Sequence, residues 1–388
     1  MKIGIDSIGF QTAGYVFQLS ELAKQYGIDP AKYEHGLMQK QMSVASPDED
    51  VVTLGYGAAK QALYDCDDVE SIKLLIFATE TGVDQSKSAG MHLHRFLKLN
   101  PNCRVFELKQ ACYASSAALQ LSVSMIRSDP KLKALIIASD IAKYGSGTPG
   151  EPTQGCGSVA MIVSANPKIM EIEPYSGVWS ADENDFWRPC YSEVAFVDGK
   201  HSVQLYLSHL GNAWGNYKRQ SGLSFADIDQ VCYHTPFSKM AIKAHNELTR
   251  LNEVECNEKV NSTLHYTPYI GNCYTAALYV CLLSMLGNSG VDVSGKRVGM
   301  FAYGSGSVGE FFSGIVQNGY KQRIEPLSGS IQEALTSRKI IGFDKFREFY
   351  NFWNDYRGAD VLTPAYSKNK LRLKGITEHK RVYELKDA

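Results

Sequence analysis

The amino-acid sequence predicts an α/β fold built from two similar halves. Two segments, LLIFATE at 74–80 and KALIIASD at 133–140, are apolar at successive positions, which is typical of strands covered on both faces. Strands and helices alternate along the chain, and the second half repeats the order of the first. The two apolar helices begin alike, with ACYASSAAL at 111–119 and NCYTAALYV at 272–280. This alternation predicts layers of sheet and helix joined by right-handed crossovers.

The first half, residues 1–170, opens and closes with a predicted strand. A Gly/Pro-rich loop over 145–157 precedes the last of these strands, as expected where the chain must turn. We expect strands at 2–10, 74–80, 103–110, 133–140 and 158–165, and helices at 20–27, 51–65, 87–99 and 113–128.

The second half, residues 171–388, carries a C-terminal extension from about residue 325. No Pro/Ser-rich linker separates the halves, so we expect one compact body. In the extension, the Lys and Arg of two charged alternating segments at 368–376 and 379–385 are expected to protect an exposed sheet edge. We expect strands at 230–236, 297–305 and 310–316, and helices at 238–251, 274–286 and 343–356.

The composition argues against several kinds of partner. Forty Lys and Arg against 41 Asp and Glu leave a formal charge of -1, so the chain has no global field for nucleic acid or anionic membrane. Its longest apolar stretch, at 276–286, is shorter than the roughly 20 residues of a membrane-spanning helix. Asp6 interrupts the N-terminal apolar segment that a signal peptide would need. We therefore expect a cytoplasmic protein that binds neither nucleic acid nor membrane.

The cysteines and histidines do not form metal-binding motifs. Nine cysteines are scattered without CxxC pairs, which argues against both a disulfide framework and a zinc cluster. His92 and His94 lie two apart on a predicted helix, where side chains diverge by about 200° and cannot share a metal. We expect no metal.

Cys112 is the leading candidate nucleophile. It follows a predicted strand and stands at the start of a helix with small residues behind it, where the helix dipole favours a thiolate that can accept acyl groups. Cysteine is also a common small buried residue, and Cys273 has the same local setting in the second half. Position alone does not choose between the two cysteines.

Glu80 and His234 occupy matching places in the two halves, each at the end of a predicted buried strand. Ligands of α/β folds usually bind at such ends, and partial burial would raise the pKa of Glu80 towards that of a general acid or base. Taken singly, Glu80 could cap a turn and His234 could be structural. If the halves face each other, however, both side chains converge with Cys112 on one site.

Three further motifs could contribute. Gly304, Gly306 and Gly309 match the spacing of a dinucleotide fingerprint, but a strand-like segment follows where the fingerprint requires a helix. We instead expect a tight turn whose backbone N–H groups form an oxyanion hole. Lys239 and Lys243 share one helix face and could hold phosphates or simply be solvated. The segment DFWRP at 185–189 is expected to form a lid or pocket wall.

Together these motifs resemble the bacterial hydroxymethylglutaryl-CoA (HMG-CoA) synthase family. The resemblance runs in order from residue 1 to about residue 320 and weakens in the tail. It implies a thiolase-like five-layer αβαβα fold and a homodimer. The motifs that carry it are ATETGVDQSKS, FELKQACYASSAALQL, GEPTQGCGSVAMI, DFWRP, YHTPFSKMAIKA, YIGNCYTAALY and FAYGSGSVGEF.

The resemblance also implies a reaction. Cys112 would take an acetyl group from acetyl-CoA, Glu80 would remove a proton from the acetyl methyl group, and His234 would anchor acetoacetyl-CoA. The N–H groups of Cys112 and of the turn from Gly304 to Ser307 would stabilise the enolate. No cofactor is implied, because both CoA thioesters are substrates. Asn272 and Ser305 would contact the acetoacetyl group, Asp140, Tyr144 and Asp185 would orient the site, and Lys239 and Lys243 would face CoA phosphates.

Other functions remain to be weighed. A related branch of the family adds an acetyl-derived carbon to a chain on an acyl carrier protein, and NCRVFELKQACY and YHTPF resemble that branch. That branch tends to lack the two lysines and the Trp of DFWRP, so a free CoA acceptor is favoured. An inactive acyl-CoA-binding protein is disfavoured because Cys112, Glu80 and His234 are all present. A decarboxylating ketoacyl synthase would have a second His or an Asn in place of Glu80.

Overall fold

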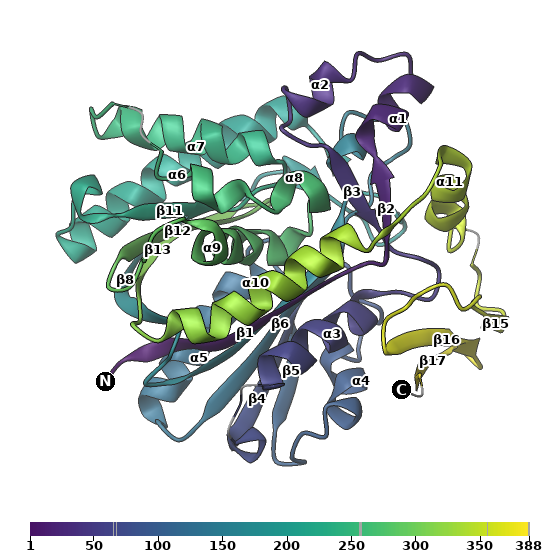
Figure 1. Cartoon of the computed structure of the whole chain (residues 1–388), viewed down its shortest axis with the longest axis horizontal. Helices are drawn as coiled ribbons and strands as arrows, with labels where there is room; N and C mark the ends of the chain where they lie inside the picture. The colour runs from purple at the N-terminus through teal and green to yellow at the C-terminus, as the bar shows by residue number, and fades with distance from the viewer. Residues whose placement is uncertain (65, 67, 256–257, 355, 387–388) are drawn as a thin grey trace.

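A nine-stranded mixed sheet runs through the molecule, in the order β11-β12-β13-β8-β1-β7-β6-β4-β5 (Figure 1). The computed structural model describes residues 1–64, 66, 68–255, 258–354 and 356–386. Strand β1 (Ile3–Thr12) joins the two halves, because it pairs with β7 along its length and with β8 only at Gly4 and Ile5. The other strands are β4 (Ile72–Ala78), β5 (Arg104–Leu108), β6 (Lys133–Ile141), β7 (Cys156–Ala165), β8 (Met170–Ser180), β11 (Gln230–Tyr233), β12 (Arg297–Gly304) and β13 (Val308–Val316).

The strand pairing confirms the predicted duplication. In the first half, β1 to β7 and β7 to β6 are antiparallel and β6 to β4 is parallel. In the second half, β8 to β13 and β13 to β12 are antiparallel and β12 to β11 is parallel. The apolar helices α5 (Ala114–Ser128) and α9 (Ala277–Asn288) therefore hold equivalent places. The division of the chain at residue 170 stays a prediction.

Successive strand residues face different helical layers, which gives the five layers of a thiolase-like fold (Figure 1). Leu75 and Phe77 pack towards α3 (Val51–Tyr64) and α4 (Ala89–Phe96). Phe301 and Phe311 pack towards α6 (Gly199–Ser221) and α7 (Ser238–Leu251). Between the two halves of the sheet lies the largest core, to which α5, α9 and α10 (Tyr320–Thr336) contribute. A predicted α/β fold with layered halves is thus confirmed.

The strands and helices expected from the sequence are present, with ends shifted by a few residues. The last residue predicted for α3, Asp65, and one residue of the predicted helix at 343–356, Asp355, lie outside the described part of the chain. Three of the longer elements, besides most of the short ones, were not predicted. Strand β8 contains Pro174 and is exposed over much of one half, helix α6 contains several glycines, and α10 has Pro326 within it.

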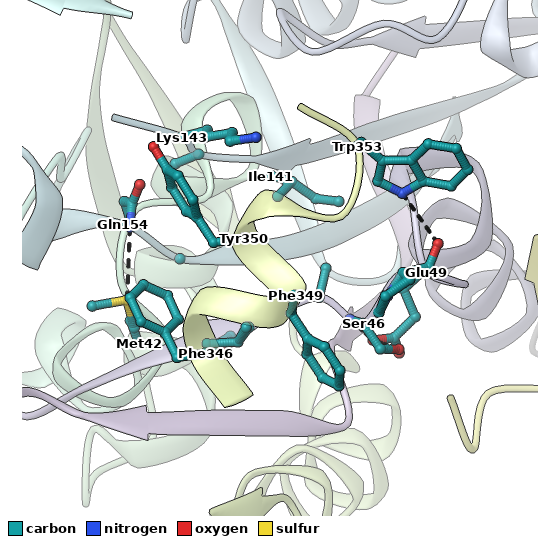
Figure 2. A pocket seen from close by; sticks show the side chains of 16 residues that line it. Met42, Ser46, Glu49, Ile141, Lys143, Gln154, Phe346, Phe349, Tyr350 and Trp353 are labelled. Atoms are coloured by element: carbon teal, nitrogen blue, oxygen red, sulfur yellow. Dashed lines mark hydrogen bonds between the residues drawn. The ribbon is translucent and has the colours of Figure 1, made fainter. Parts of the chain in front are cut away.

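A cap of short elements covers the first half where β6 ends. It consists of β2 (Tyr15–Gln18), α1 (Leu19–Gln25), β3 (Gln41–Val44), β14 (Lys339–Ile340) and the C-terminal helix α11 (Phe343–Asn351). All of these except the exposed β14 contribute to one apolar cluster. Phe17 stacks on Phe346 of α11 at a ring distance of 4.7 Å. Figure 2 shows the aromatic side chains of α11 lining a pocket opposite Ile141 and Lys143. The tail therefore packs against the strand that leads into the site described below.

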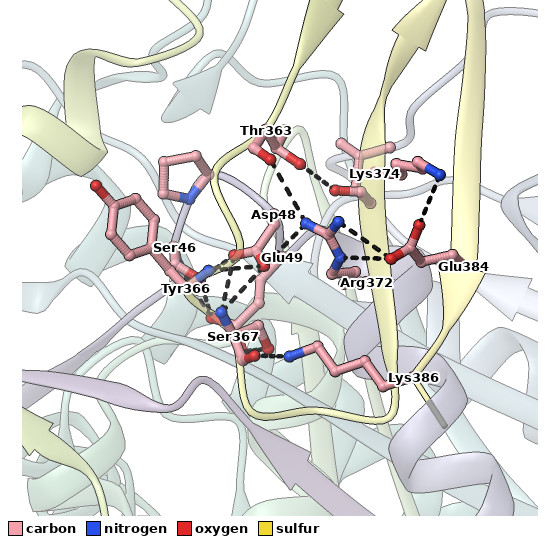
Figure 3. A network of polar contacts seen from close by, with 12 residues as sticks. Ser46, Asp48, Glu49, Thr363, Tyr366, Ser367, Arg372, Lys374, Glu384 and Lys386 are labelled. Carbon is pink, nitrogen blue, oxygen red and sulfur yellow. Dashed lines mark hydrogen bonds and ion pairs between the residues drawn. The ribbon is translucent and has the colours of Figure 1, made fainter. Parts of the chain in front are cut away.

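The charged tail forms a three-stranded sheet, β15 (Val361–Leu362), β16 (Leu371–Thr377) and β17 (Lys380–Leu385). Arg372 pairs with Glu384 at 3.1 Å (Figure 3), and Arg381 pairs with Asp50 at 3.1 Å. The expectation that the Lys and Arg residues of these segments protect a sheet edge stays a prediction; β17, which carries Lys380 and Arg381, is an edge strand of this sheet. The two arginines also neutralise carboxylates, one of which lies at the buried start of α3.

The shorter remaining elements connect these layers. None of the helices within the described ranges is long and apolar enough to cross a membrane. The short connecting elements are α2 (Ala31–Glu34), α8 (Thr267–Ile270), β9 (Phe186–Trp187), β10 (Phe196–Val197) and the 3-10 turns at Val69–Ser71, Glu151–Thr153, Phe225–Asp227, Asn261–Leu264 and Tyr274–Ala276.

Candidate active site

Cys112 lies in a tight loop between β5 and α5. The preceding residue, Ala111, has a positive φ of 44°, a conformation that non-glycine residues rarely adopt. The loop presses against the end of β12: a Cβ on Gly304 would lie 2.5 Å from the carbonyl oxygen of Gln110 and 2.7 Å from the Cβ of Tyr113. Gly304 therefore allows the second half of the chain to approach the Cys112 loop.

Glu80 contacts Cys112 directly. Two residues beyond β4, its Oε1 lies 3.2 Å from the Cys112 Sγ, which donates a hydrogen bond to it. Burial, together with the nearby charge of Asp140, raises the pKa of Glu80 to about 8. The Arg188 guanidinium donates to the Glu80 carbonyl oxygen. The predicted rise in the Glu80 pKa is confirmed, and the group is suited to proton transfer near neutral pH.

The Cys112 thiol is not a resting thiolate. Burial raises its pKa well above the usual value, and the Glu80 carboxylate raises it further. The predicted effect of the helix dipole is therefore outweighed, because α5 begins only at Ala114 and an acidic side chain touches the sulfur. For Cys112 to act as a nucleophile, its proton would have to leave, and Glu80 is in contact with the sulfur to accept it.

Asp140 ties the two halves together beside Glu80. It is fully buried at the end of β6 and accepts from the backbone N–H groups of Glu80 and Thr81 at 3.0 Å. Its second oxygen accepts from the N–H and hydroxyl groups of Thr275, at 3.1 and 2.5 Å, at the start of the α9 segment. Asp140 thus orients the turn that carries Glu80.

His234 follows β11 and is 3% exposed. Burial lowers its pKa to about 3, so the ring is neutral at physiological pH. Its backbone is fixed by a 2.8 Å bond to the Phe301 carbonyl oxygen and by the Tyr206 hydroxyl at 2.7 Å. The Nδ1 atom is buried and has no protein partner among the described residues. A neutral imidazole with an unused nitrogen can exchange a hydrogen bond with a bound carbonyl group.

Aromatic side chains surround Cys112. Tyr144, Phe186 and Tyr274 form mutual edge-to-face contacts at 5.9 to 6.3 Å, and Cys112 packs against this cluster. The Tyr144 hydroxyl is hydrogen-bonded to the side chains of Tyr274 and Asn272. Phe186 belongs to the DFWRP segment, which therefore forms part of the pocket wall.

Asp185 organises the glycine-rich turn. Its carboxylate is fully buried and accepts from the Tyr303 hydroxyl and the Gly306 N–H, both at 3.0 Å. The Ser307 N–H donates to the Ala181 carbonyl oxygen at 2.8 Å. The prediction that this turn supplies oxyanion donors is therefore wrong for Gly306 and Ser307, because internal acceptors already use their N–H groups. The strand β13 after the turn confirms that this is no dinucleotide fingerprint.

The remaining predicted residues lie further out. Ser305 is half-buried in the same turn, and its carbonyl oxygen accepts from the Gln110 amide at 3.2 Å. Lys239 and Lys243 lie in the first turns of α7, shortly after His234. Lys239 is half-buried and Lys243 is exposed, with its Nζ 5.7 Å from the Phe237 ring centre. Cys273 is buried in the core.

The sequence reasoning missed one pair beside the nucleophile. Tyr113 follows Cys112 in the chain, and its hydroxyl donates to Oε2 of Glu310 in strand β13 at 2.7 Å. Burial raises the pKa of both side chains. The available signal was a glutamate inside the otherwise apolar strand pattern VGEFFSGIV. The pair fastens the Cys112 loop to the second half.

A half-buried cysteine and a carboxylate able to accept a proton, between the two halves of a thiolase-like fold, define an acyl-transferring enzyme. The chain belongs to the hydroxymethylglutaryl-CoA synthase family. The family models for the N-terminal and C-terminal parts of this synthase match residues 1–168 and residues 171–259 and 245–385.

Individual relatives include members of both branches of the family. The hydroxymethylglutaryl-CoA synthase of Enterococcus faecalis is 37% identical over 329 residues, covering 84% of this chain and 86% of the relative. The polyketide biosynthesis 3-hydroxy-3-methylglutaryl-ACP synthase of Bacillus subtilis is 36% identical over 340 residues, covering 81% and 80%. A crystal structure of HMG-CoA synthase complexed with CoA superimposes with a TM-score of 0.92 at 36% identity, covering 99% of this chain and 100% of that one.

Proposed function

We propose that the protein is a hydroxymethylglutaryl-CoA synthase that condenses acetyl-CoA with acetoacetyl-CoA through an acetyl-Cys112 thioester, giving HMG-CoA and CoA. The contact of 3.2 Å between the Cys112 Sγ and a Glu80 carboxylate of raised pKa carries this proposal. It joins a nucleophile to a proton acceptor in one buried site.

In the first step, the Cys112 sulfur attacks the thioester carbonyl carbon of acetyl-CoA, and the thiol proton passes to Glu80. The tetrahedral intermediate then collapses, the bond to the CoA sulfur breaks, and the leaving thiolate takes up a proton. Asp140 holds the Glu80 backbone during this exchange through the 3.0 Å bond from its N–H. The aromatic wall of Tyr144, Phe186 and Tyr274 excludes water from the acetyl group.

In the second step, Glu80 removes a proton from the acetyl methyl group, and the resulting enolate attacks the ketone carbon of acetoacetyl-CoA. The neutral His234 ring donates to the ketone oxygen, and Glu80 returns its proton to the new alkoxide. Asn272 and Ser305 contact the acetoacetyl group. Water then hydrolyses the thioester to Cys112 and releases HMG-CoA, which restores the thiol.

The acceptor is proposed to be a CoA thioester because Lys239 and Lys243 lie on the first turns of α7, beyond His234. Each charge-assisted phosphate contact contributes about 1.5 to 3 kcal/mol. A second candidate is a β-ketone on an acyl carrier protein. It is supported by the Bacillus subtilis relative. Crystal structures of the curacin-pathway HMG synthase, at 30% identity and a TM-score of 0.92, hold a carrier protein as the donor and support carrier-protein binding by that branch.

Acetylation of Cys112 tests the proposal. Purified protein is incubated with acetyl-CoA, and the modified peptide is identified by mass spectrometry. The proposal expects the acetyl group on Cys112, none on Cys273, and no labelling in a Cys112→Ala variant. Acetylation elsewhere, or none, contradicts it.

We further propose a cytoplasmic homodimer that takes part in the mevalonate pathway. Strand β5 ends the nine-stranded sheet, and its residues are only half-buried or exposed. An exposed edge of this kind can pair with a second copy. Light scattering of the purified protein measures the mass directly, and a value near one chain would contradict the dimer.

A further inference from the structure

The loop that carries Tyr144 is held from outside by the C-terminal helix α11. This Tyr144 loop, residues 143–151, leaves the end of β6 three residues after Asp140. On its inner side, Tyr144 reaches the cluster around Cys112. On its outer side, it faces α11 and the residues that follow it, which the chain supplies from the tail. One short segment therefore connects the reacting sulfur with the C-terminal helix.

Arg347 of α11 makes the strongest of these outer contacts. Its Nη2 lies 2.6 Å from Glu151 Oε1, and its Nη1 donates to the Ser146 hydroxyl at 2.8 Å. The Glu151 side chain is completely buried and also accepts from the Gly147 N–H at 2.7 Å and the Tyr26 hydroxyl at 2.8 Å. A nearby cation and hydrogen-bond donors offset the cost of burying a carboxylate. Arg347 therefore fixes the middle and the end of the loop through one guanidinium group.

Two further contacts lie at the start of the loop. The Tyr350 hydroxyl donates to the carbonyl oxygen of Tyr144 itself. The Lys143 Nζ donates to Asn354 and lies 4.6 Å from the Tyr350 ring centre. Figure 2 shows Lys143 and Tyr350 side by side at one end of the pocket beneath α11. The backbone of Tyr144 is thus set directly by a tail residue more than two hundred positions away.

We propose that Arg347 and Tyr350 are positioning residues for the reaction at Cys112. They fix the Tyr144 loop, and the loop fixes the aromatic wall against which the acetyl group lies. Neither side chain needs to touch substrate. This inference rests on the proposed function, and an error of about 1 Å in such a wall can reduce turnover as much as a hundredfold.

The test compares variants of the full-length enzyme. Tyr350→Phe removes one oxygen atom, Arg347→Ala removes the guanidinium, and Arg347→Lys keeps a charge opposite Glu151. Tyr366→Phe is the matched control. Within the described part of the chain, the Tyr366 hydroxyl contacts α11 at Lys345 and Glu348 and does not contact the Tyr144 loop. We expect kcat to fall several-fold in Tyr350→Phe and roughly 10- to 100-fold in Arg347→Ala. Lysine should recover part of the loss, and the control should match wild type.

A double-mutant cycle with Tyr144→Ala separates positioning from general stabilisation. If Arg347 acts through Tyr144, Arg347→Ala should reduce kcat much less in the Tyr144→Ala background than in wild type. A purely structural role would lower the melting temperature equally in both backgrounds and leave the two kcat effects additive. Additive effects, or unchanged kcat in Tyr350→Phe and Arg347→Ala, would overturn the inference.

A readout without turnover distinguishes this inference from the proposed function. Wild-type enzyme that does not condense the two CoA thioesters contradicts the proposed function alone. The rate of Cys112 alkylation by iodoacetamide, followed on its peptide, then tests the loop. A change of threefold or more in Arg347→Ala, absent in Tyr366→Phe, supports positioning, and equal rates in all variants contradict it.

Discussion

At the scale of single residues, Cys112 and Glu80 behave as one titrating pair. Their side chains are 3.2 Å apart, and burial raises the pKa of both. The Glu80 carboxylate raises the Cys112 pKa further, whereas the hydrogen bond from the thiol lowers the Glu80 pKa. At neutral pH the pair therefore keeps its protons.

The pH dependence follows from the sign of the Glu80 shift. Burial raises this pKa from 4.5 to about 8, so the carboxyl group is mostly protonated below pH 8 and only the deprotonated form accepts a proton. The rate of condensation from acetylated enzyme should rise about tenfold per pH unit below the pKa and level off above it. Acetylation removes the thiol donor that lowers this pKa, so the midpoint should not fall below 8. Single-turnover rates from pH 6 to 10 measure it, and a midpoint near 4.5 would contradict the account.

The Glu80→Ala variant should divide the reaction into its two steps. Removing Glu80 takes away the acceptor of the thiol proton but also a carboxylate that raises the Cys112 pKa, so the enzyme should still acquire an acetyl group, more slowly than wild type. Condensation should fall by roughly 10² to 10⁴, the usual contribution of a general base. Mass spectrometry follows the acetyl group and product analysis follows HMG-CoA. If the variant is not acetylated, the assigned division of roles is wrong.

At the scale of elements, strand ends of one half meet loops of the other. Strand β12 ends at Gly304 against the Cys112 loop, and Asp140 at the end of β6 binds the segment before α9. Because these strand ends meet loops of the other half, the two similar halves together form a single site. The two halves contribute different chemistry to it.

Gly304→Ala tests this close approach. The added Cβ would lie 2.5 to 2.8 Å from Gln110 and Tyr113 backbone and side-chain atoms, so the Cys112 loop must move. We expect the free energy of unfolding to fall by about 1 to 3 kcal/mol and acetylation of Cys112 to slow. Gly329→Ala in α10, where nothing lies within 4 Å, is the control and should be neutral or stabilising. Normal acetylation by Gly304→Ala would show that the contact is not required.

The sequence predicts an element well when all its residues are buried, and poorly when buried and exposed residues alternate irregularly along it. Strands such as β4 and β6 have continuous apolar residues, because helices cover both faces. Strand β8 alternates irregularly and contains Pro174, and α10 contains Pro326, so their patterns favour no single structure. Cys112, Glu80 and His234 were found from strand and helix ends. The Cys112 pKa was not, because it depends on a contact between segments 32 residues apart.

At the scale of the whole molecule, the C-terminal tail is anchored by buried acidic residues of the first half. Asp48 is fully buried and accepts from the N–H groups of Tyr366 and Ser367 at 3.1 and 3.0 Å (Figure 3). Asp50 accepts from the Tyr383 hydroxyl at 2.6 Å. These bonds hold the tail in place, and with it the helix α11 that faces the Tyr144 loop.

Asp48→Ala should loosen the tail. It leaves the buried Ser367 N–H without its acceptor, which costs about 1 to 3 kcal/mol, whereas the Tyr366 N–H keeps its bond to the Pro364 carbonyl oxygen. We expect a matching loss of unfolding free energy and new protease cleavage between residues 357 and 370. The control is Asp292→Ala, whose pair with Lys321 is exposed and contributes about 0 to 1 kcal/mol. Equal protease resistance in both variants would contradict the proposed anchoring.

The most direct test of the proposed reaction is an acceptor competition. Purified enzyme is given acetyl-CoA with either acetoacetyl-CoA or an acetoacetyl carrier protein, while free thiol release and product mass are followed. The account predicts rapid formation of HMG-CoA from acetoacetyl-CoA, abolished in Cys112→Ser and weakened by loss of Lys239 and Lys243. Turnover with the carrier protein alone would contradict the CoA acceptor and assign the enzyme to the carrier-protein branch of its family.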